Sequence, residues 1–126
     1  MTTRVVVADD VADLRWMLRA VFNTDERFEV VGEAATGTEA VNVVNLTRPD
    51  VVVLDLLMPE MDGLEAAEHI TSRAPATRIV FLTGIEKSVL PDSEATRRAV
   101  YLQKGASVGR ILHTVAEAAG RSDHTD

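Results

Sequence analysis

The sequence predicts a doubly wound α/β domain, in which a five-stranded parallel sheet carries helices on both faces. The first observation is a set of short apolar runs without polar alternation, which is typical of parallel strands covered on both faces. The clearest runs are VVVA at residues 5–8, VVVL at 51–54 and IVFL at 79–82. The second observation is that segments of helical periodicity separate these runs. Such alternation favours parallel strands joined by right-handed crossovers.

Five strands and five helices are expected from these patterns. The strands are predicted at residues 4–8, 29–34, 51–54, 78–82 and 99–103. The helices are predicted at residues 12–22, 38–46, 63–73, 93–98 and 108–119. Side chains suited to helix capping precede three of the helices, namely Thr36 or Thr38, Asp62 and Ser107. Pro91 lies inside the fourth helical segment, and because proline disrupts a helix interior, this helix is expected to be short or irregular.

Length and composition indicate one domain rather than two. The chain has 126 residues, and we expect one domain over residues 1–120 followed by a polar C-terminal tail at 121–126. Its net charge of −7 argues against direct contact with nucleic acid. The absence of cysteine excludes disulfides and thiolate metal sites. Apolar runs are too short to span a bilayer, so the sequence predicts no membrane segment and a cytoplasmic location.

Chemically active side chains follow several of the predicted strands. Asp9 and Asp10 follow the first strand, Asp55 the third, Thr83 the fourth and Lys104 the fifth. The carboxyl ends of parallel strands share one edge of a sheet, so these groups are expected to converge there. Two carboxylates about 5 Å apart repel by roughly 3 kcal/mol at an effective dielectric constant near 20. Carboxylate oxygens at this spacing suit Mg²⁺, which would offset that repulsion, and the set as a whole indicates phosphoryl transfer.

The chain resembles the response-regulator receiver domain of two-component signalling from Arg4 to about Ala119. The matching pieces are VVVADD at residues 5–10, VVVLDLLMPEMDG at 51–63, FLTG at 81–84 and YLQKG at 101–105. The block DLLMPEMDG is highly specific, and all four pieces occur in the family's order. The resemblance implies a flavodoxin-like sheet with strand order 2-1-3-4-5.

The resemblance also implies a role for each matching residue. Asp55 is expected to accept a phosphoryl group from a histidine kinase or a histidine phosphotransfer protein. The expected Mg²⁺ ligands are Asp55, Asp10, Asp9 through a coordinated water, and the backbone carbonyl of Leu57. Thr83 and Lys104 are expected to bind phosphoryl oxygens. Tyr101 is expected to turn inward when Thr83 moves, which would change the binding of a downstream protein or effector domain.

Two alternative functions compete with this interpretation. A Mg²⁺-dependent phosphohydrolase would usually carry a second carboxylate two residues after the nucleophile, where this chain has Leu57. A degenerate receiver could act as an interaction module that does not depend on phosphorylation, and the unusual fourth-helix region keeps this alternative open. We therefore expect a signalling switch that is not a turnover enzyme. The sequence leaves open whether the receiver acts alone or belongs to a longer regulator with an effector domain.

Two further expectations concern apolar side chains. Leu57 and Ile85 should flank the phosphoryl group and offer an attacking water no hydrogen bond, which predicts slow self-dephosphorylation. In the first helix, one stripe is expected to face the core and consists of Leu14, Met17, Leu18 and Val21. Trp16 points away from this stripe, with Ala12 and Ala20 one turn to either side. This exposed patch is a candidate docking surface for the phosphodonor's helices or for a second copy of the chain, with a lone surface tryptophan as the equally weighted alternative.

Overall fold

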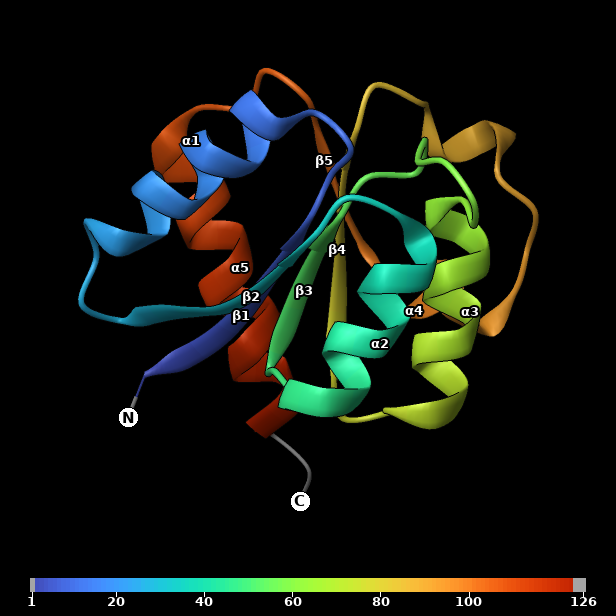
Figure 1. Cartoon of the computed structure of the whole chain (residues 1–126), viewed down its shortest axis with the longest axis horizontal. Helices are drawn as coiled ribbons and strands as arrows, with labels where there is room; N and C mark the ends of the chain where they lie inside the picture. The colour runs from blue at the N-terminus through green and yellow to red at the C-terminus, as the bar shows by residue number, and fades with distance from the viewer. Residues whose placement is uncertain (1, 124–126) are drawn as a thin grey trace.

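The computed structural model describes the backbone of residues 2–123 and the side chains of residues 2–120. Its centre is a parallel five-stranded sheet in the order β2-β1-β3-β4-β5, as expected from the family resemblance (Figure 1). The strands are β1 (Thr3–Ala8), β2 (Phe28–Ala34), β3 (Val51–Leu54), β4 (Arg78–Thr83) and β5 (Val100–Gln103). Each lies within one residue of its predicted bounds, because apolar runs bounded by polar residues mark buried strands clearly.

The helices also occur where helical periodicity predicts them. They are α1 (Ala12–Asn23), α2 (Gly37–Thr47), α3 (Gly63–Arg73), α4 (Glu94–Arg98) and α5 (Val108–Asp123), with a 3₁₀ turn η1 (Lys87–Val89) before α4. Thr36 caps α2 by accepting a hydrogen bond from the Glu39 amide at 3.1 Å. Asp62 caps α3 in the same way, at 2.9 Å from the Glu65 amide.

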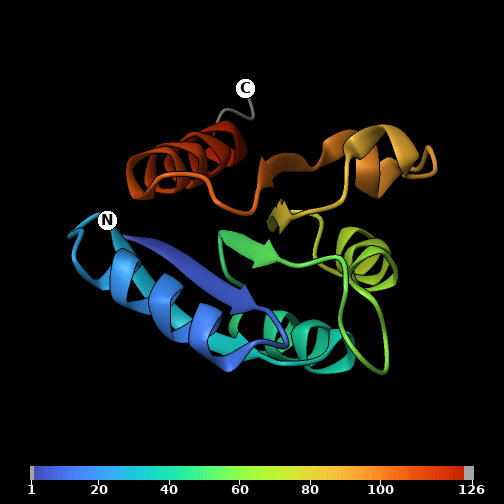
Figure 2. The same cartoon turned by 90° about the horizontal axis from the view of Figure 1, so that it is seen from above.

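Helices cover both faces of the sheet and create two hydrophobic cores (Figure 2). On one face, Val5 and Val7 of β1 lie in the core formed with α1 and α5. On the other face, Val6 and Ala8 lie in the core formed with α2, α3 and α4. Successive side chains of a strand point to opposite faces, so a continuous apolar run serves both cores. This double burial explains why the strands show no polar alternation.

The buried face of α1 differs from the predicted stripe. Met17 is exposed, whereas Leu18 and Phe22 are the fully buried side chains of this helix. The Phe22 ring packs edge-on against Phe28 of β2, with ring centroids 5.2 Å apart. This aromatic contact rotates the helix toward Phe22, which periodicity alone assigned to no face. In α5, likewise, Val108 is exposed and the buried stripe begins at Ile111.

The region around α4 is short and irregular, as Pro91 predicts. The helix has only five residues, and the 3₁₀ turn η1 precedes it. Ser93 and Thr96 stabilise its start through a reciprocal capping box, because each side chain accepts from the other's amide. The Thr96 hydroxyl also donates to the Pro91 carbonyl oxygen at 2.9 Å. Local hydrogen bonds therefore replace the helical turns that proline prevents.

At the C-terminal end, α5 runs to Asp123, four residues beyond its predicted end at Ala119. The last three residues of the expected tail, 124–126, lie outside the described residues. None of the helices in the described part of the chain combines the length and apolarity that a bilayer crossing requires.

Candidate functional site

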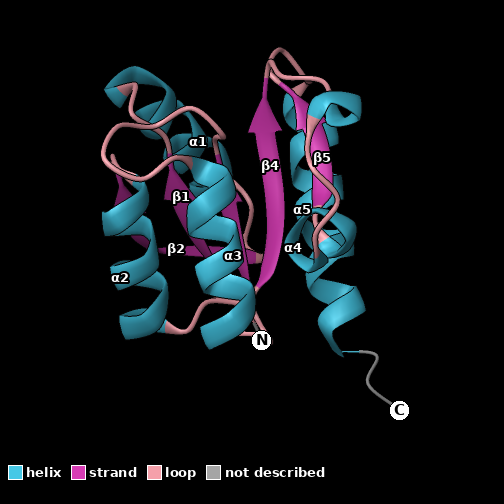
Figure 3. Ribbon diagram, turned by 90° about the vertical axis from the view of Figure 1, so that its right-hand side faces the viewer, coloured by secondary structure: helices cyan, strands magenta, loops and turns pink. Residues whose placement is uncertain are grey.

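The site lies at the carboxyl ends of β1 and β3, which are neighbours in the centre of the sheet. Ala8 pairs with Leu54 at the end of the two strands, and the Asp55 amide donates to the Ala8 carbonyl oxygen at 3.0 Å. The chain continues from β1 to β2 on one side and from β3 to β4 on the other. Loops gather at this rim, beyond the arrowheads of the strands (Figure 3). This is the switch point at which doubly wound sheets place their ligand sites.

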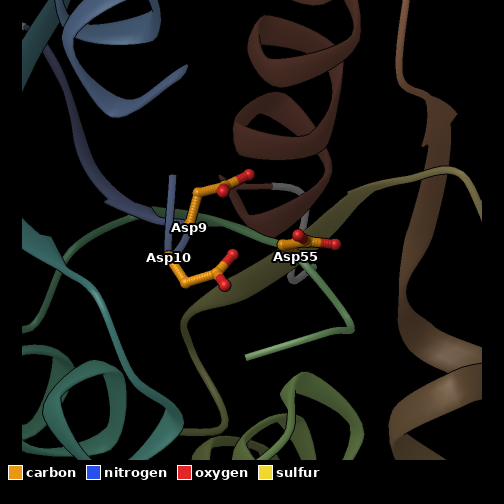
Figure 4. Close-up of side chains that lie close together, drawn as sticks. All are labelled: Asp9, Asp10 and Asp55. Atoms are coloured by element: carbon orange, nitrogen blue, oxygen red, sulfur yellow. The ribbon is translucent and has the colours of Figure 1, made fainter. Parts of the chain in front are cut away.

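Three carboxylates meet at the switch point (Figure 4). Asp9 and Asp10 project from the end of β1 and Asp55 from the end of β3, and each offers an oxygen within 4.8 Å of the other two. Asp9 and Asp55 are only 2% and 4% exposed, whereas Asp10 is exposed to solvent. The cluster therefore has two buried members and one open side, through which an ion or a phosphodonor can approach.

Lys104 supplies the opposite charge. Its Nζ lies 2.9 Å from Asp55 Oδ2 and 3.3 Å from Asp9 Oδ2. The Lys104 amide donates to the Thr83 carbonyl oxygen, which extends the β4–β5 pairing to the rim. Partial burial lowers the pKa of the Lys104 ammonium, but the hydrogen bond and the negative charge of Asp55, together with those of Asp9, outweigh it and raise the pKa overall. Lys104 is therefore a fixed positive charge at neutral pH.

Burial and nearby groups shift the pKa of Asp9, some upward and some downward. Burial raises the pKa of this carboxyl above its ordinary value. A hydrogen bond from the Val11 amide opposes the rise, the charge of Asp55 adds to it, and the charge of Lys104 opposes it. Burial and the repulsion by Asp55 together exceed the opposing contributions, so a further cation would stabilise the ionised carboxyl.

The donor set fits a hard divalent cation. Three carboxylate oxygens with one open side match the preference of Mg²⁺ for a few carboxylates plus water or phosphate oxygens. The Leu57 amide nitrogen lies 3.4 Å from Asp55 Oδ1, so the backbone of residue 57 runs beside the cluster. The role of the Leu57 carbonyl as a further ligand stays a prediction.

The backbone after Asp55 is packed against the start of α3. A Cβ at Gly63 would lie 2.0 Å from the Asp55 carbonyl oxygen, so only glycine fits this position. The Gly63 amide donates to the Leu56 carbonyl oxygen at 2.8 Å. The glycine that ends the DLLMPEMDG block therefore allows α3 to hold the backbone of the Asp55 loop in place.

Thr83 lies at the end of β4, and Tyr101 lies on the neighbouring strand β5, opposite Phe81. The buried Thr83 hydroxyl accepts a hydrogen bond from the Ile85 amide at 3.2 Å. The Tyr101 hydroxyl donates to the Thr96 carbonyl oxygen at 3.3 Å, and its ring lies 5.3 Å from that of Phe81. Burial raises the pKa of Tyr101, so the phenol remains a hydrogen-bond donor. The coupled movement of these two side chains stays a prediction.

Trp16 is exposed on α1, as helical geometry predicts. This residue is 73% exposed, beside an exposed Ala12 and a half-buried Ala20. Sequence reasoning missed Arg15, whose Nη1 donates to the Asp9 carbonyl oxygen at 2.7 Å. Its only signal in the sequence is a basic residue near the start of the first predicted helix, five residues after Asp10.

The fold and the acidic rim together define a flavodoxin-like signalling domain. The chain belongs to the response regulator receiver domain family, whose model matches residues 5–116. Members of this family are the phosphorylation switches of two-component systems. They bind Mg²⁺ at an acidic pocket and interact with kinases or phosphotransfer proteins and with effectors.

Individual relatives agree with this assignment. The chain is 43% identical over 102 residues to the transcriptional regulatory protein YhcZ of Bacillus subtilis. The alignment covers 79% of this chain and 48% of YhcZ. It is 32% identical over 117 residues to the chemotaxis protein CheY of Listeria monocytogenes. That alignment covers 92% of this chain and 98% of CheY. The REC domain of AraT, a response regulator from Geobacillus stearothermophilus, has a TM-score of 0.83 at 32% identity and covers 98% of this chain and 97% of that one. The chain thus spans about half of YhcZ and nearly all of CheY.

Replacement of Asp10 by Asn should stabilise the metal-free protein. The exposed Asp10 carboxylate adds repulsion of about 1 kcal/mol at the dielectric constant of water, so its loss should raise Tm by roughly 4 °C for a domain of this size. The same change should remove most of the Tm increase that Mg²⁺ causes in the parent protein. Calorimetric unfolding in EDTA and in Mg²⁺ measures both effects. A metal-free variant less stable than the parent would contradict the repulsion argument.

Proposed function

We propose that this chain accepts a phosphoryl group on Asp55 from a histidine kinase or a histidine phosphotransfer protein and then changes its binding to a downstream partner. The observation that carries the proposal is the contact between Lys104 and Asp55, 2.9 Å apart inside a cluster of three carboxylates. A buried nucleophile beside an ammonium and a cation site is the arrangement that phosphoryl transfer needs. Membership of the receiver family supports the same role.

The chemical step uses residues whose positions are known. An Asp55 oxygen forms a bond to phosphorus while the P–N bond of the phosphohistidine donor breaks and its electron pair stays on the imidazole nitrogen. Lys104 stabilises negative charge on the phosphoryl oxygens and is already held at this place by its ion pair with Asp55. Asp9, Asp10, Asp55 and the Leu57 carbonyl would hold Mg²⁺, which would supply further charge stabilisation when bound.

The signal is proposed to travel through Thr83 and Tyr101. The Thr83 hydroxyl at present accepts a hydrogen bond from the Ile85 amide and would turn to donate its own hydrogen to a phosphoryl oxygen. A surface hollow lined by Thr83, Ile85 and Tyr101 provides space for the Tyr101 ring to turn inward. This rotation would break the bond from Tyr101 to the Thr96 carbonyl and alter the surface formed by α4 and β5. A downstream protein or an effector domain would read that change.

The phosphodonor is proposed to dock on the patch formed by Trp16, Ala12 and Ala20. The patch lies on α1, which begins two residues after Asp10 and therefore borders the open side of the cluster. Large aromatic side chains flanked by small residues are frequent anchors at protein interfaces. A second copy of the chain is the other occupant to be tested. The cytoplasmic location, the absence of nucleic-acid contact and the absence of metabolite turnover stay predictions.

Convergence of the site argues against a degenerate receiver. Asp9, Asp10, Asp55 and Lys104 come from three separate segments, and the fold still brings their charged groups together. Three like charges at this spacing are costly to a domain that no longer uses them. A binding module without phosphorylation would lose nothing by replacing them.

The first test is the substitution Asp55→Asn. With acetyl phosphate and Mg²⁺, the parent should gain the mass of one phosphoryl group, whereas the variant should stay unlabelled because a carboxamide is a poor nucleophile. Intact-mass spectrometry measures the reaction, and EDTA should abolish it in the parent. Asp13→Asn, at an exposed acid outside the cluster, serves as the matched control. Equal labelling of the Asp55→Asn variant and the parent would refute the proposal.

Phosphorylated protein should lose its label slowly, because Leu57 and Ile85 cannot orient a water molecule. Leu57 is 63% exposed, so Leu57→Asn places an amide beside Asp55 without disturbing the core. We expect this variant to dephosphorylate severalfold faster, measured as decay of the acyl phosphate by mass spectrometry. Leu46→Asn, which makes the same change at an exposed leucine of α2, should leave the rate unchanged. An unchanged or slower decay in Leu57→Asn would count against the explanation.

Trp16→Ala should distinguish a role in docking the phosphodonor from a role in the phosphorylation reaction itself. The variant should accept phosphate from its cognate kinase severalfold more slowly, because an interface anchor is lost, and should react normally with acetyl phosphate. Leu46→Ala removes a similarly exposed apolar side chain from α2 and should affect neither reaction. Equal losses with both donors would show that Trp16 acts on the fold or the site rather than on docking.

A further inference from the structure

Arg15 connects the acidic rim to the neighbouring strand β2. Its side chain is only 20% exposed, and its Nη1 donates to the Asp9 carbonyl oxygen at 2.7 Å. On its other side, Arg15 Nε lies 3.6 Å from Glu33 Oε1. Arg19, one turn further along α1, lies 2.6 Å from the other oxygen of Glu33 but, among the described residues, forms no hydrogen bond with Asp9. The two arginines therefore share one carboxylate but differ in what they reach.

Asp9 is held at every polar group, whereas Asp10 is not. The Asp9 amide donates to the Ala34 carbonyl oxygen, its Oδ1 accepts from the Val11 amide, and its Oδ2 lies beside Lys104. Its carbonyl oxygen accepts from Arg15. For the Asp10 carboxylate, by contrast, the described backbone and the side chains of residues 2–120 provide no hydrogen bond or ion pair. Its place in the cluster must therefore come from the backbone that carries it.

The link between the two residues is one peptide unit. The Asp9 carbonyl and the Asp10 nitrogen belong to the same rigid plane, so a donor that fixes the carbonyl oxygen also fixes the plane. Together with the φ angle of Asp10, that plane sets the direction in which the Asp10 side chain leaves the backbone. Figure 4 shows this side chain directed to the same region as Asp55.

We infer that Arg15 is a positioning residue: through the Asp9 carbonyl it orients the Asp10 carboxylate toward the cation site, and Glu33 holds Arg15 in place for this task. The inference rests on the proposed function, because it assigns Asp10 as a ligand of Mg²⁺. It concerns a residue that touches neither the phosphoryl group nor the metal. Groups that orient metal ligands typically change metal affinity about 10- to 100-fold when removed.

A positioning role and a purely electrostatic role for Arg15 predict opposite effects of its removal on Mg²⁺ affinity. The positive guanidinium lies close to the acidic cluster and repels a cation by Coulomb's law. If charge were its whole contribution, Arg15→Gln would bind Mg²⁺ more tightly than the parent. If Arg15 orients Asp10, the variant binds Mg²⁺ more weakly. The sign of the change therefore distinguishes the two roles.

Mg²⁺ titration by calorimetry of the whole 126-residue chain provides the main test. We expect Arg15→Gln to bind Mg²⁺ about tenfold more weakly, and Arg19→Gln to bind it like the parent. Arg19→Gln removes the same charge type and the shorter ion pair with Glu33, so it is a matched control. Unchanged or tighter binding by Arg15→Gln overturns the inference, as does an equal loss in both variants.

Two further measurements separate orientation from loss of structure. In the metal-free proteins, NMR shifts of the Asp9 carbonyl carbon and the Asp10 amide nitrogen should change in Arg15→Gln and not in Arg19→Gln. If Arg15→Gln unfolds in EDTA, Arg15→Lys replaces it, because lysine keeps a donor for the Asp9 carbonyl while losing the Glu33 contact. Arg15→Lys should bind Mg²⁺ more tightly than Arg15→Gln where both fold, and more weakly than the parent. Parent-like Mg²⁺ binding by Arg15→Lys, or unchanged NMR shifts in Arg15→Gln, contradicts the inference.

The outcome is independent of phosphorylation. If the parent binds Mg²⁺ but acetyl phosphate does not label Asp55, the proposed function fails while the Mg²⁺ titrations still decide the role of Arg15. If the parent is labelled and all three variants bind Mg²⁺ equally, the proposed function stands and the positioning role of Arg15 is refuted.

Discussion

The charge balance of the site depends on the ion pair between Lys104 and Asp55. Asp55 follows a strand whose four residues are all buried, and a carboxylate in such surroundings is costly unless a partner offsets the lost hydration. Lys104 is that partner, yet it comes from the end of β5, two strands away in the sheet order. Its backbone is placed by pairing with Thr83 of β4. The position of Lys104 beside Asp55 thus depends on the register of β3, β4 and β5.

The two sides of the site are packed very differently. On the α3 side, Gly63 brings the helix directly against the backbone of Asp55, and Asp62 caps the helix start. On the α4 side, a five-residue helix and a 3₁₀ turn leave a hollow beside Tyr101. Close packing transmits a displacement, whereas an open hollow accommodates one. The structure therefore has room for movement on the α4–β5 side, where Thr83 and Tyr101 lie.

Much of the fold and part of the site could be predicted from local sequence. The strand bounds, the caps Thr36 and Asp62, and the short fourth helix all depend on properties of neighbouring residues. Convergence of Asp9, Asp10 and Asp55 could also be predicted, because parallel strands of one sheet must end at one rim. The rotation of α1 could not, since it depends on the packing of Phe22 against Phe28, two residues on different elements.

The sequence by itself determined which chemical groups this protein can bring to a sheet edge: an acidic pair, a lone aspartate, a threonine and a lysine, each at the carboxyl end of a predicted strand. Only the tertiary structure decided how these groups are held. Lys104 contacts two carboxylates that belong to distant segments of the chain, and Arg15 lies between the Asp9 carbonyl and Glu33 of β2. Such contacts depend on strand register and helix rotation. Both are set by the packing of the whole core, which no local pattern of residues encodes.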